Sequence, residues 1–228
     1  MRIITFLLIV ASSSLALAQE GRLIACRFAS LDSNTPVPAM LTLSQDGAEV
    51  PVSVPSGSIS TPVACFTTTN TLSFISAADR KPLATAAIPA TTKAAILLFV
   101  EAPKTGAALP WRVFVIEDSD KNFPDGGAFV ANFHNQDVRF IIGEHKVLLQ
   151  PGKYNGVARP NQRDDFNMAP VVFQFQVGDA WKDASESMLR FLPGSRYLMF
   201  TFLDQASGRP KIVTFQDFKV VTAPPVRR

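Results

Sequence analysis

Apolar and polar residues alternate over short stretches of this chain, and turn residues separate one stretch from the next. The pattern is clearest in residues 128–152, where Phe129, Ala131 and Phe133 fall on one face of a short segment. A period of two, interrupted by Asn, Asp and Gly, predicts β-strands joined by hairpins. Because the alternation continues along most of the chain, we predict an all-β fold.

The predicted strands recur in the same order in the two halves of the chain. The matched pairs are Arg22–Phe28 with Ala128–Phe133, Met40–Gly57 with Val138–Gly152, Leu72–Ile75 with Phe173–Val177, Ala94–Val100 with Tyr197–Phe202, and Trp111–Asp118 with Lys211–Phe218. Repetition of this kind predicts two tandem immunoglobulin-like or related β-sandwich modules, at residues 19–105 and 106–221, before a flexible tail at 222–228. The alternative is one large sandwich, in which the likeness of the halves reflects only shared β periodicity.

The first 18 residues have the pattern of a secretory signal peptide. Arg2 supplies the positive start, Ile3–Val10 is a short apolar core, and Ala16-Leu17-Ala18 forms a small-x-small cleavage site. We therefore expect an exported protein, periplasmic or extracellular, whose mature chain begins at Gln19. A lipid anchor on Cys26 is the alternative, because Leu23-Ile24-Ala25-Cys26 resembles a lipobox. No apolar run has the length of a transmembrane segment.

The chain contains two cysteines, Cys26 and Cys65. An even number of cysteines in an exported chain favours a disulfide, so we predict that these two are bonded. Two buried free thiols are the alternative.

The charge and the rarity of histidine limit the classes of function. The net charge is only +3, and the basic residues are scattered, so we expect no nucleic-acid partner. Only His134 and His145 could act as imidazole bases, and no G-x-S-x-G motif occurs. We therefore predict that the protein is not an enzyme, and a hydrolase that uses His134 is the least favoured hypothesis.

One loop has oxygen ligands at alternating positions. Asp118, Asp120, Asn122 and Asp125 resemble the start of a calcium loop. However, Phe123 occupies the position that needs glycine, and the twelfth position is also a phenylalanine. The loop is therefore a weak calcium candidate, and we expect no other cofactor.

A carbohydrate site is a second candidate. Tyr154 lies in a long polar segment, and Trp181 and Asp183 follow a turn further along the chain. If the two segments meet, they offer aromatic rings and a carboxylate, which are the groups of a sugar-binding site.

The second half also resembles a known group of proteins. Phe133-His134-Asn135, Val138–Gly143 and Leu149–Gly152 look like a pattern of small exported bacterial β-sandwich proteins of unknown function. The resemblance covers mainly residues 128–218 and implies a fold but no catalytic residues. The function we expect is non-catalytic binding of a protein partner in the cell envelope, through sheet edges or the Asp118–Gly127 and Lys153–Asn167 loops.

Overall fold

The computed structural model describes residues 21–31, 35–103, 106–204 and 208–218. The expected signal peptide, the mature start at Gln19 and the C-terminal tail lie outside these ranges. All regular structure in the described residues is β, in 16 strands that form four sheets of four. The prediction of an all-β fold is therefore confirmed.

The first sandwich is built from eight strands in two sheets, with orders β4-β1-β7-β8 and β3-β2-β5-β6. Its strands are β1 (Arg22–Ser30), β2 (Met40–Leu43), β3 (Glu49–Val52), β4 (Val63–Thr67), β5 (Thr71–Ser76), β6 (Pro82–Ala87), β7 (Ala94–Glu101) and β8 (Trp111–Glu117). Side chains from both sheets form one apolar core around Phe28, Phe74 and Phe99.

The second sandwich repeats this arrangement, with sheet orders β12-β9-β15-β16 and β11-β10-β13-β14. Its strands are β9 (Ala128–Asn132), β10 (Val138–Ile142), β11 (His145–Leu149), β12 (Tyr154–Val157), β13 (Met168–Val177), β14 (Ala180–Arg190), β15 (Ser195–Leu203) and β16 (Pro210–Phe218). Phe140 and Phe173, which alternation predicts to be core residues, are both buried in it.

Each strand of the first sandwich has a counterpart eight strands later, including the parallel pairs β1–β7 and β9–β15. The predicted module boundary at residue 106 is wrong in one respect, because it assigns Trp111–Glu117 to the second module. This strand is β8, and it pairs with β7 along its whole length. The first sandwich therefore extends to Glu117, and the link to the second runs from Asp118 to Gly127.

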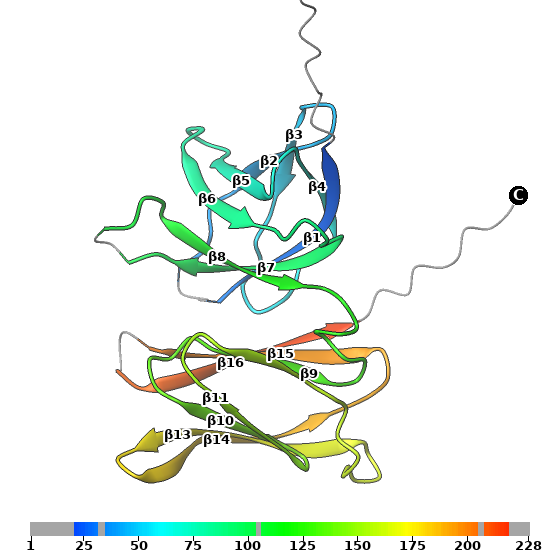
Figure 1. Cartoon of the computed structure of the whole chain (residues 1–228), viewed down its shortest axis with the longest axis vertical. Coiled ribbons are helices and arrows are strands. Elements are labelled where there is room, and N and C mark those ends of the chain that lie inside the picture. Colours follow the sequence, from blue (N-terminus) through cyan, green and yellow to red (C-terminus); the bar gives the residue numbers. More distant parts are fainter. Residues whose placement is uncertain (1–20, 32–34, 104–105, 205–207, 219–228) are drawn as a thin grey trace, which may run out of the picture.

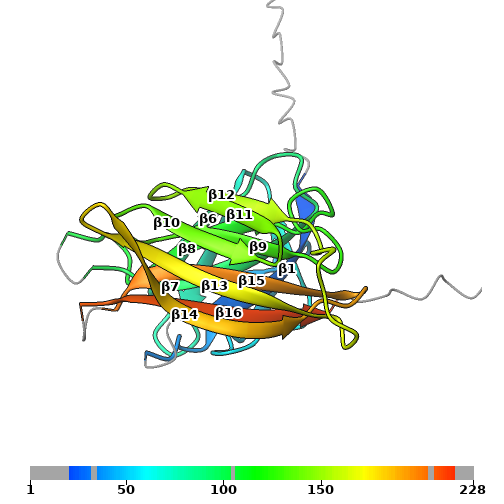
Figure 2. The same ribbon diagram turned by 90° about the horizontal axis from the view of Figure 1, so that it is seen from below.

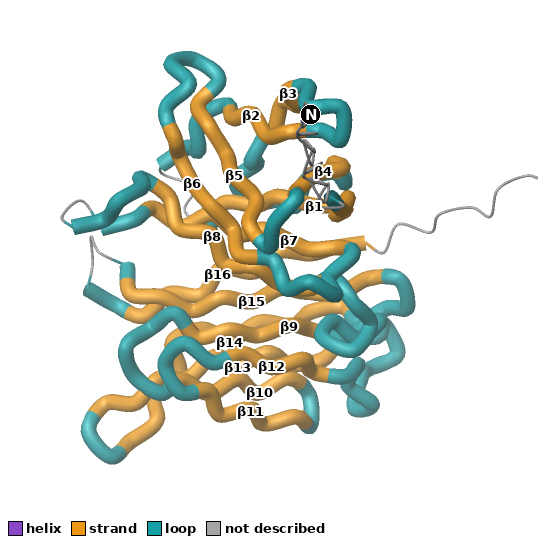
Figure 3. The backbone as a smooth tube through the Cα atoms, turned by 45° about the horizontal axis from the view of Figure 1, so that its top comes forward, coloured by secondary structure: helices purple, strands orange, loops and turns teal. Residues whose placement is uncertain are grey.

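The two sandwiches stack through their central sheets, so that the molecule has four layers (Figures 1 and 3). A third apolar core lies between the modules, and it includes Leu98 of β7, Phe129 of β9 and Phe200 of β15. The central strands are thus buried on both faces, which explains why β7, and β15 from Tyr197 onward, are mostly apolar.

The predicted disulfide is absent, and both cysteines are buried free thiols. The register of β1 with β4 places Cys26 opposite Val63 and Cys65 opposite Ile24, so the two cysteines are diagonal neighbours. Diagonal Cα atoms lie roughly 7–8 Å apart, which exceeds the usual separation in a disulfide of roughly 4.4–6.8 Å. The thiol of Cys65 and burial together raise the pKa of Cys26 above its ordinary value.

Cys26 lies inside β1, so cleavage at the lipobox-like sequence would remove the first residues of that strand. Within the ranges that the structure describes, no helix is long and apolar enough to cross a membrane.

Candidate functional site

A cluster of four charged side chains, three of them buried and the fourth, that of Asp118, partly buried, joins the two sandwiches. We call Arg27, Asp118, Arg196 and Asp217 the charge cluster. Asp217 accepts hydrogen bonds from both guanidinium groups, and Nε of Arg196 lies 2.9 Å from its Oδ2. Arg196 also donates to Asp118, at 2.6 Å. Burial disfavours the charged form of Arg27, but the bonds and charge of Asp217 raise its pKa overall. The two positive and two negative groups thereby balance.

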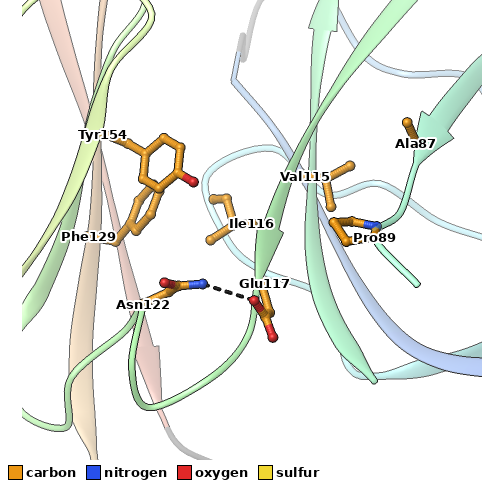
Figure 4. Close-up of a pocket in the computed structure, with 8 residues that line it drawn as sticks. All are labelled: Ala87, Pro89, Val115, Ile116, Glu117, Asn122, Phe129 and Tyr154. Carbon is orange, nitrogen blue, oxygen red and sulfur yellow. Dashed lines mark hydrogen bonds between the residues drawn. The ribbon is translucent and has the colours of Figure 1, made fainter. Parts of the chain in front are cut away.

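A cleft of about 180 Å³ opens at the same junction, beside β8 (Figure 4). We call it the junction cleft. It is lined by Ala87, Pro89, Val115, Ile116, Glu117, Asn122, Phe129 and Tyr154. The first five residues belong to the first sandwich, Asn122 lies in the link, and the last two belong to the second sandwich. Clefts between domains are common places for ligand sites, because two rigid units supply the walls.

Tyr154 forms the wall on the side of the second sandwich. Its ring stacks on Phe129, with centroids 5.3 Å apart, and meets Phe114 edge-on at 6.0 Å. The side chain is nevertheless 56% exposed. Its hydroxyl has no hydrogen-bond partner among the described residues. A partly exposed aromatic ring that two other rings hold in place is a pre-organised contact surface.

Glu117 and Asn122 form the polar end of the cleft. The side-chain amide of Asn122 donates to Oε2 of Glu117 at 3.2 Å, as the dashed line in Figure 4 shows. In the part of the chain that the structure describes, Glu117 has no Lys or Arg within ion-pair distance. The cleft therefore combines apolar walls with one uncompensated negative charge.

Glycine brings the connecting loop and β12 together. A Cβ atom on Gly156 would lie 2.8 Å from the carbonyl oxygen of Asn122, and one on Gly127 would lie 2.1 Å from that of Val157. Any larger residue would push the loop away from β12. These two glycines thus position Asn122 next to Tyr154.

Trp181 and Asp183 lie elsewhere, on the outer face of the β11-β10-β13-β14 sheet, which Figure 2 shows from below. Gln174 links Arg139 to Asp183 through hydrogen bonds of 2.5 and 2.6 Å. The guanidinium of Arg139 lies 4.5 Å from the centre of the Trp181 ring. The condition for a joint site of Tyr154 with Trp181 and Asp183, that their segments meet, is not met, because two different sheets of the second sandwich carry them.

The four calcium candidates are not brought together either. Asp118 belongs to the charge cluster, Asn122 bonds to Glu117, and Asp125 accepts the backbone N–H of Gly194 at 2.9 Å. Asp120 has an interaction of its own. Among the described residues, no group of three or more His, Cys, Asp and Glu is placed to hold a metal ion.

The two histidines have local partners. His134 is buried, and its Nδ1 accepts the backbone N–H of Gln136 at 3.1 Å. His145 lies 3.5 Å from Glu144 in the turn between β10 and β11. The imidazole of His134 thus supports the turn before β10, whereas Nε2 of His145 is buried without a hydrogen-bond partner among the described residues.

No family model matches the chain, and no curated protein matches it in sequence. The junction cleft must therefore be judged by its own geometry. Sequence reasoning named Tyr154 and Asn122 but overlooked Glu117 and Phe129. The glycines at 127 and 156 were a signal for close backbone approach, but only the fold shows which segments approach each other.

Proposed function

We propose that this chain is an exported, non-catalytic protein of the cell envelope that binds a protein partner at the junction cleft. One observation carries the proposal: the edge of β8 and residues from both expected loops line a single cleft. Asn122 comes from the Asp118–Gly127 loop, and Tyr154 comes from the Lys153–Asn167 segment. Exposed tyrosines held by neighbouring rings are typical anchors of protein interfaces.

The stacking of the sandwiches supports a binding role. The third core and the charge cluster hold the two walls of the cleft at a fixed separation. Binding to a pre-organised cleft avoids the entropic cost of ordering its walls. The protein would therefore act as a rigid holder for its partner.

The test compares three forms of the full mature chain: the wild type, Tyr154→Ala and Trp181→Ala. Each is immobilised and exposed to an envelope extract of its source, and retained proteins are identified by mass spectrometry. We expect a partner that the wild type and Trp181→Ala retain and that Tyr154→Ala loses. Trp181→Ala is a matched control, because it removes a partly exposed aromatic ring from a different face. Equal retention by all three forms would contradict the proposal.

A second candidate is carbohydrate binding on the outer face that carries Trp181. The observation that favours it is the row of Arg139, Gln174 and Asp183 beside the ring. Sugars stack on aromatic faces and hydrogen-bond to such polar groups. A glycan array that binds the wild type and Tyr154→Ala, but not Trp181→Ala, would select this function instead.

A further inference from the structure

The junction cleft has room for one long side chain. Its volume of about 180 Å³ is below the roughly 300–1,000 Å³ of pockets that bind small molecules. β6 and the residues after it close the cleft on the side of the first sandwich, where Ala87 and Pro89 line it together with Val115 of β8. A ligand therefore enters this cleft as a single side chain and not as an added strand.

The lining of the cleft favours an arginine side chain. Glu117 supplies a negative charge, and Tyr154 supplies an exposed aromatic ring (Figure 4). A guanidinium group is attracted both to a carboxylate and to the face of an aromatic ring. Its aliphatic stem would pack on the apolar wall of Pro89 and Val115. The lining residues include no Lys or Arg, so the arginine comes from outside the described ranges or from another molecule.

The chain itself continues with basic residues after β16. Residues 219–228, which we call the basic segment, lie outside the described ranges. Their sequence contains Lys219, Arg227 and Arg228 but no acidic residue. The charge of the basic segment is therefore complementary to that of the cleft.

The basic segment begins close to the cleft. The carboxylates of Asp217, in β16, and of Asp118 bond to the same guanidinium group, that of Arg196, at 2.9 and 2.6 Å. Asp118 directly follows Glu117, which lines the cleft. Figure 1 shows the end of β16 beside the link between the two sandwiches. The chain therefore leaves β16 next to the junction cleft.

The two arginines are far enough along the chain to reach the cleft. Arg227 is nine positions after Phe218, the last residue of β16. An extended segment that contains proline rises roughly 3.1 Å per residue, so nine residues span about 28 Å. Neighbouring strands lie about 5 Å apart, so this length exceeds the width of a four-stranded sheet. Lys219 directly follows β16 and lacks that reach.

We propose that the basic segment folds back onto the molecule and places Arg227 or Arg228 between Tyr154 and Glu117. This inference rests on the proposed function, since it names a device that regulates access to the same cleft. The ion pair with Glu117 and the contact with the ring hold the segment in place. A partner protein must displace the segment before it can bind.

The test compares amide chemical shifts of the full mature chain with those of Arg227→Glu/Arg228→Glu and of Lys219→Glu. The double substitution should move the signals of Tyr154 and of the side-chain amide of Asn122, which bonds to the carboxylate in the cleft. Lys219→Glu is the matched control, because it reverses a charge of the same segment and keeps both arginines. Unchanged cleft signals, or equal changes in the two variants, would overturn the inference.

A second comparison ties the effect to Glu117. In a Glu117→Gln background, the two arginine substitutions should move the signal of Tyr154 much less, because the carboxylate that attracts the guanidinium is absent. Equal changes in the two backgrounds would mean that the arginines act at another place, and the inference would then be rejected.

The two proposals fail in different ways. If the basic segment fills the cleft about nine-tenths of the time, Arg227→Glu/Arg228→Glu should tighten the binding of the partner roughly tenfold. Cleft signals that ignore these substitutions, with a partner that still depends on Tyr154, remove the inference and leave the proposed function standing. Cleft signals that respond, without any partner that depends on Tyr154, remove the proposed function and leave the contact of the segment.

Discussion

The junction cleft and the charge cluster occupy related positions in the two sandwiches, yet one is open and the other is filled. The strand ladders of the two modules align, because Ala29 pairs with Leu98 as Ala131 pairs with Phe200, and all four lie in the third core. In this alignment Arg27 and Phe129 are counterparts. Arg27 is held by the charge cluster, whereas Phe129 supports Tyr154 in the cleft.

The last strands of the modules show the same contrast. Asp118, which follows β8, is the counterpart of Asp217 in β16, and both carboxylates bond to Arg196. One residue earlier, Glu117 faces the cleft without an ion pair in the described chain, and its counterpart is the neutral Gln216. The comparison teaches that a repeated framework can use one interface for two purposes: charge pairs close one side, and aromatic rings shape the other.

The largest expected effect tests whether the third core makes the two sandwiches one cooperative unit. Phe200 is fully buried and contacts Phe129, Phe133 and Phe215. Phe200→Ala should lower the free energy of unfolding by roughly 3–5 kcal/mol, through lost burial and a cavity. Phe166→Ala, which removes a ring that is 70% exposed, is the control and should change little.

The same experiment has a second readout, because each sandwich contains one of the two tryptophans, Trp111 and Trp181. In single-tryptophan variants, urea unfolding followed by fluorescence should give coincident transitions for the two modules. Separate transitions would show that the modules unfold independently and would contradict a shared core.

The next largest effect concerns the charge cluster. Asp217→Ala leaves Arg27 and Arg196 buried, with Asp118 as their one remaining ion-pair partner among the described residues. The free energy of unfolding should fall by about 3 kcal/mol, at the lower end for a broken buried pair, because Asp118 still neutralises part of the charge. The exposed Asp183→Ala is the control. A loss below about 1 kcal/mol, measured by denaturant titration, would mean that the charge cluster does not hold the modules together.

A smaller effect on stability is expected at the junction cleft. Gly156→Ala places a methyl group against the backbone of Asn122, so the connecting loop must move. We expect a loss of about 1–2 kcal/mol, as for a modest steric overlap, together with weaker retention of the partner protein from the envelope extract. Gly152→Ala is not a neutral control because its φ is positive. Ala180→Ser on the exposed β14 is a better one. Unchanged retention of the partner by Gly156→Ala would mean that the loop does not shape the cleft.

The smallest effect distinguishes two equivalent hairpin turns. Glu144 accepts the backbone N–H groups of Asn161 and Gln162 across a long segment, and these bonds, with that of Asn161 the stronger, lower its pKa to about 2. Asp46 in the first module bonds only within its own turn, where Ser44 lowers its pKa.

The pKa of Glu144 is lower in the folded state than in the unfolded state. Its contribution to the stability of the folded state is therefore present at neutral pH and is lost as the pH falls towards 2. Amide shifts of Asn161 and Gln162 should therefore titrate with a midpoint near that value in the wild type and remain constant in Glu144→Gln. A midpoint close to the ordinary glutamate pKa would contradict the anchoring role.

The sequence by itself determined the local structure of this protein. Alternation over residues such as Val138 and Phe140 predicted the strands, because a sheet with one buried face requires a period of two. The order of elements predicted the repeat, and the match of Trp111–Asp118 with Lys211–Phe218 already paired β8 with β16.

Only the tertiary structure decided which distant residues meet. The diagonal register of Cys26 and Cys65, the separation of Tyr154 from Trp181, and the capture of Asp118 by Arg196 all depend on how sheets pair and stack. A period of two assigns a residue to a face, but it carries no information about the layer that this face will meet. In the third core even that signal is incomplete: Phe129 and Ala131 lie on one face of β9, but β7, which is buried on both faces, has lost its alternation.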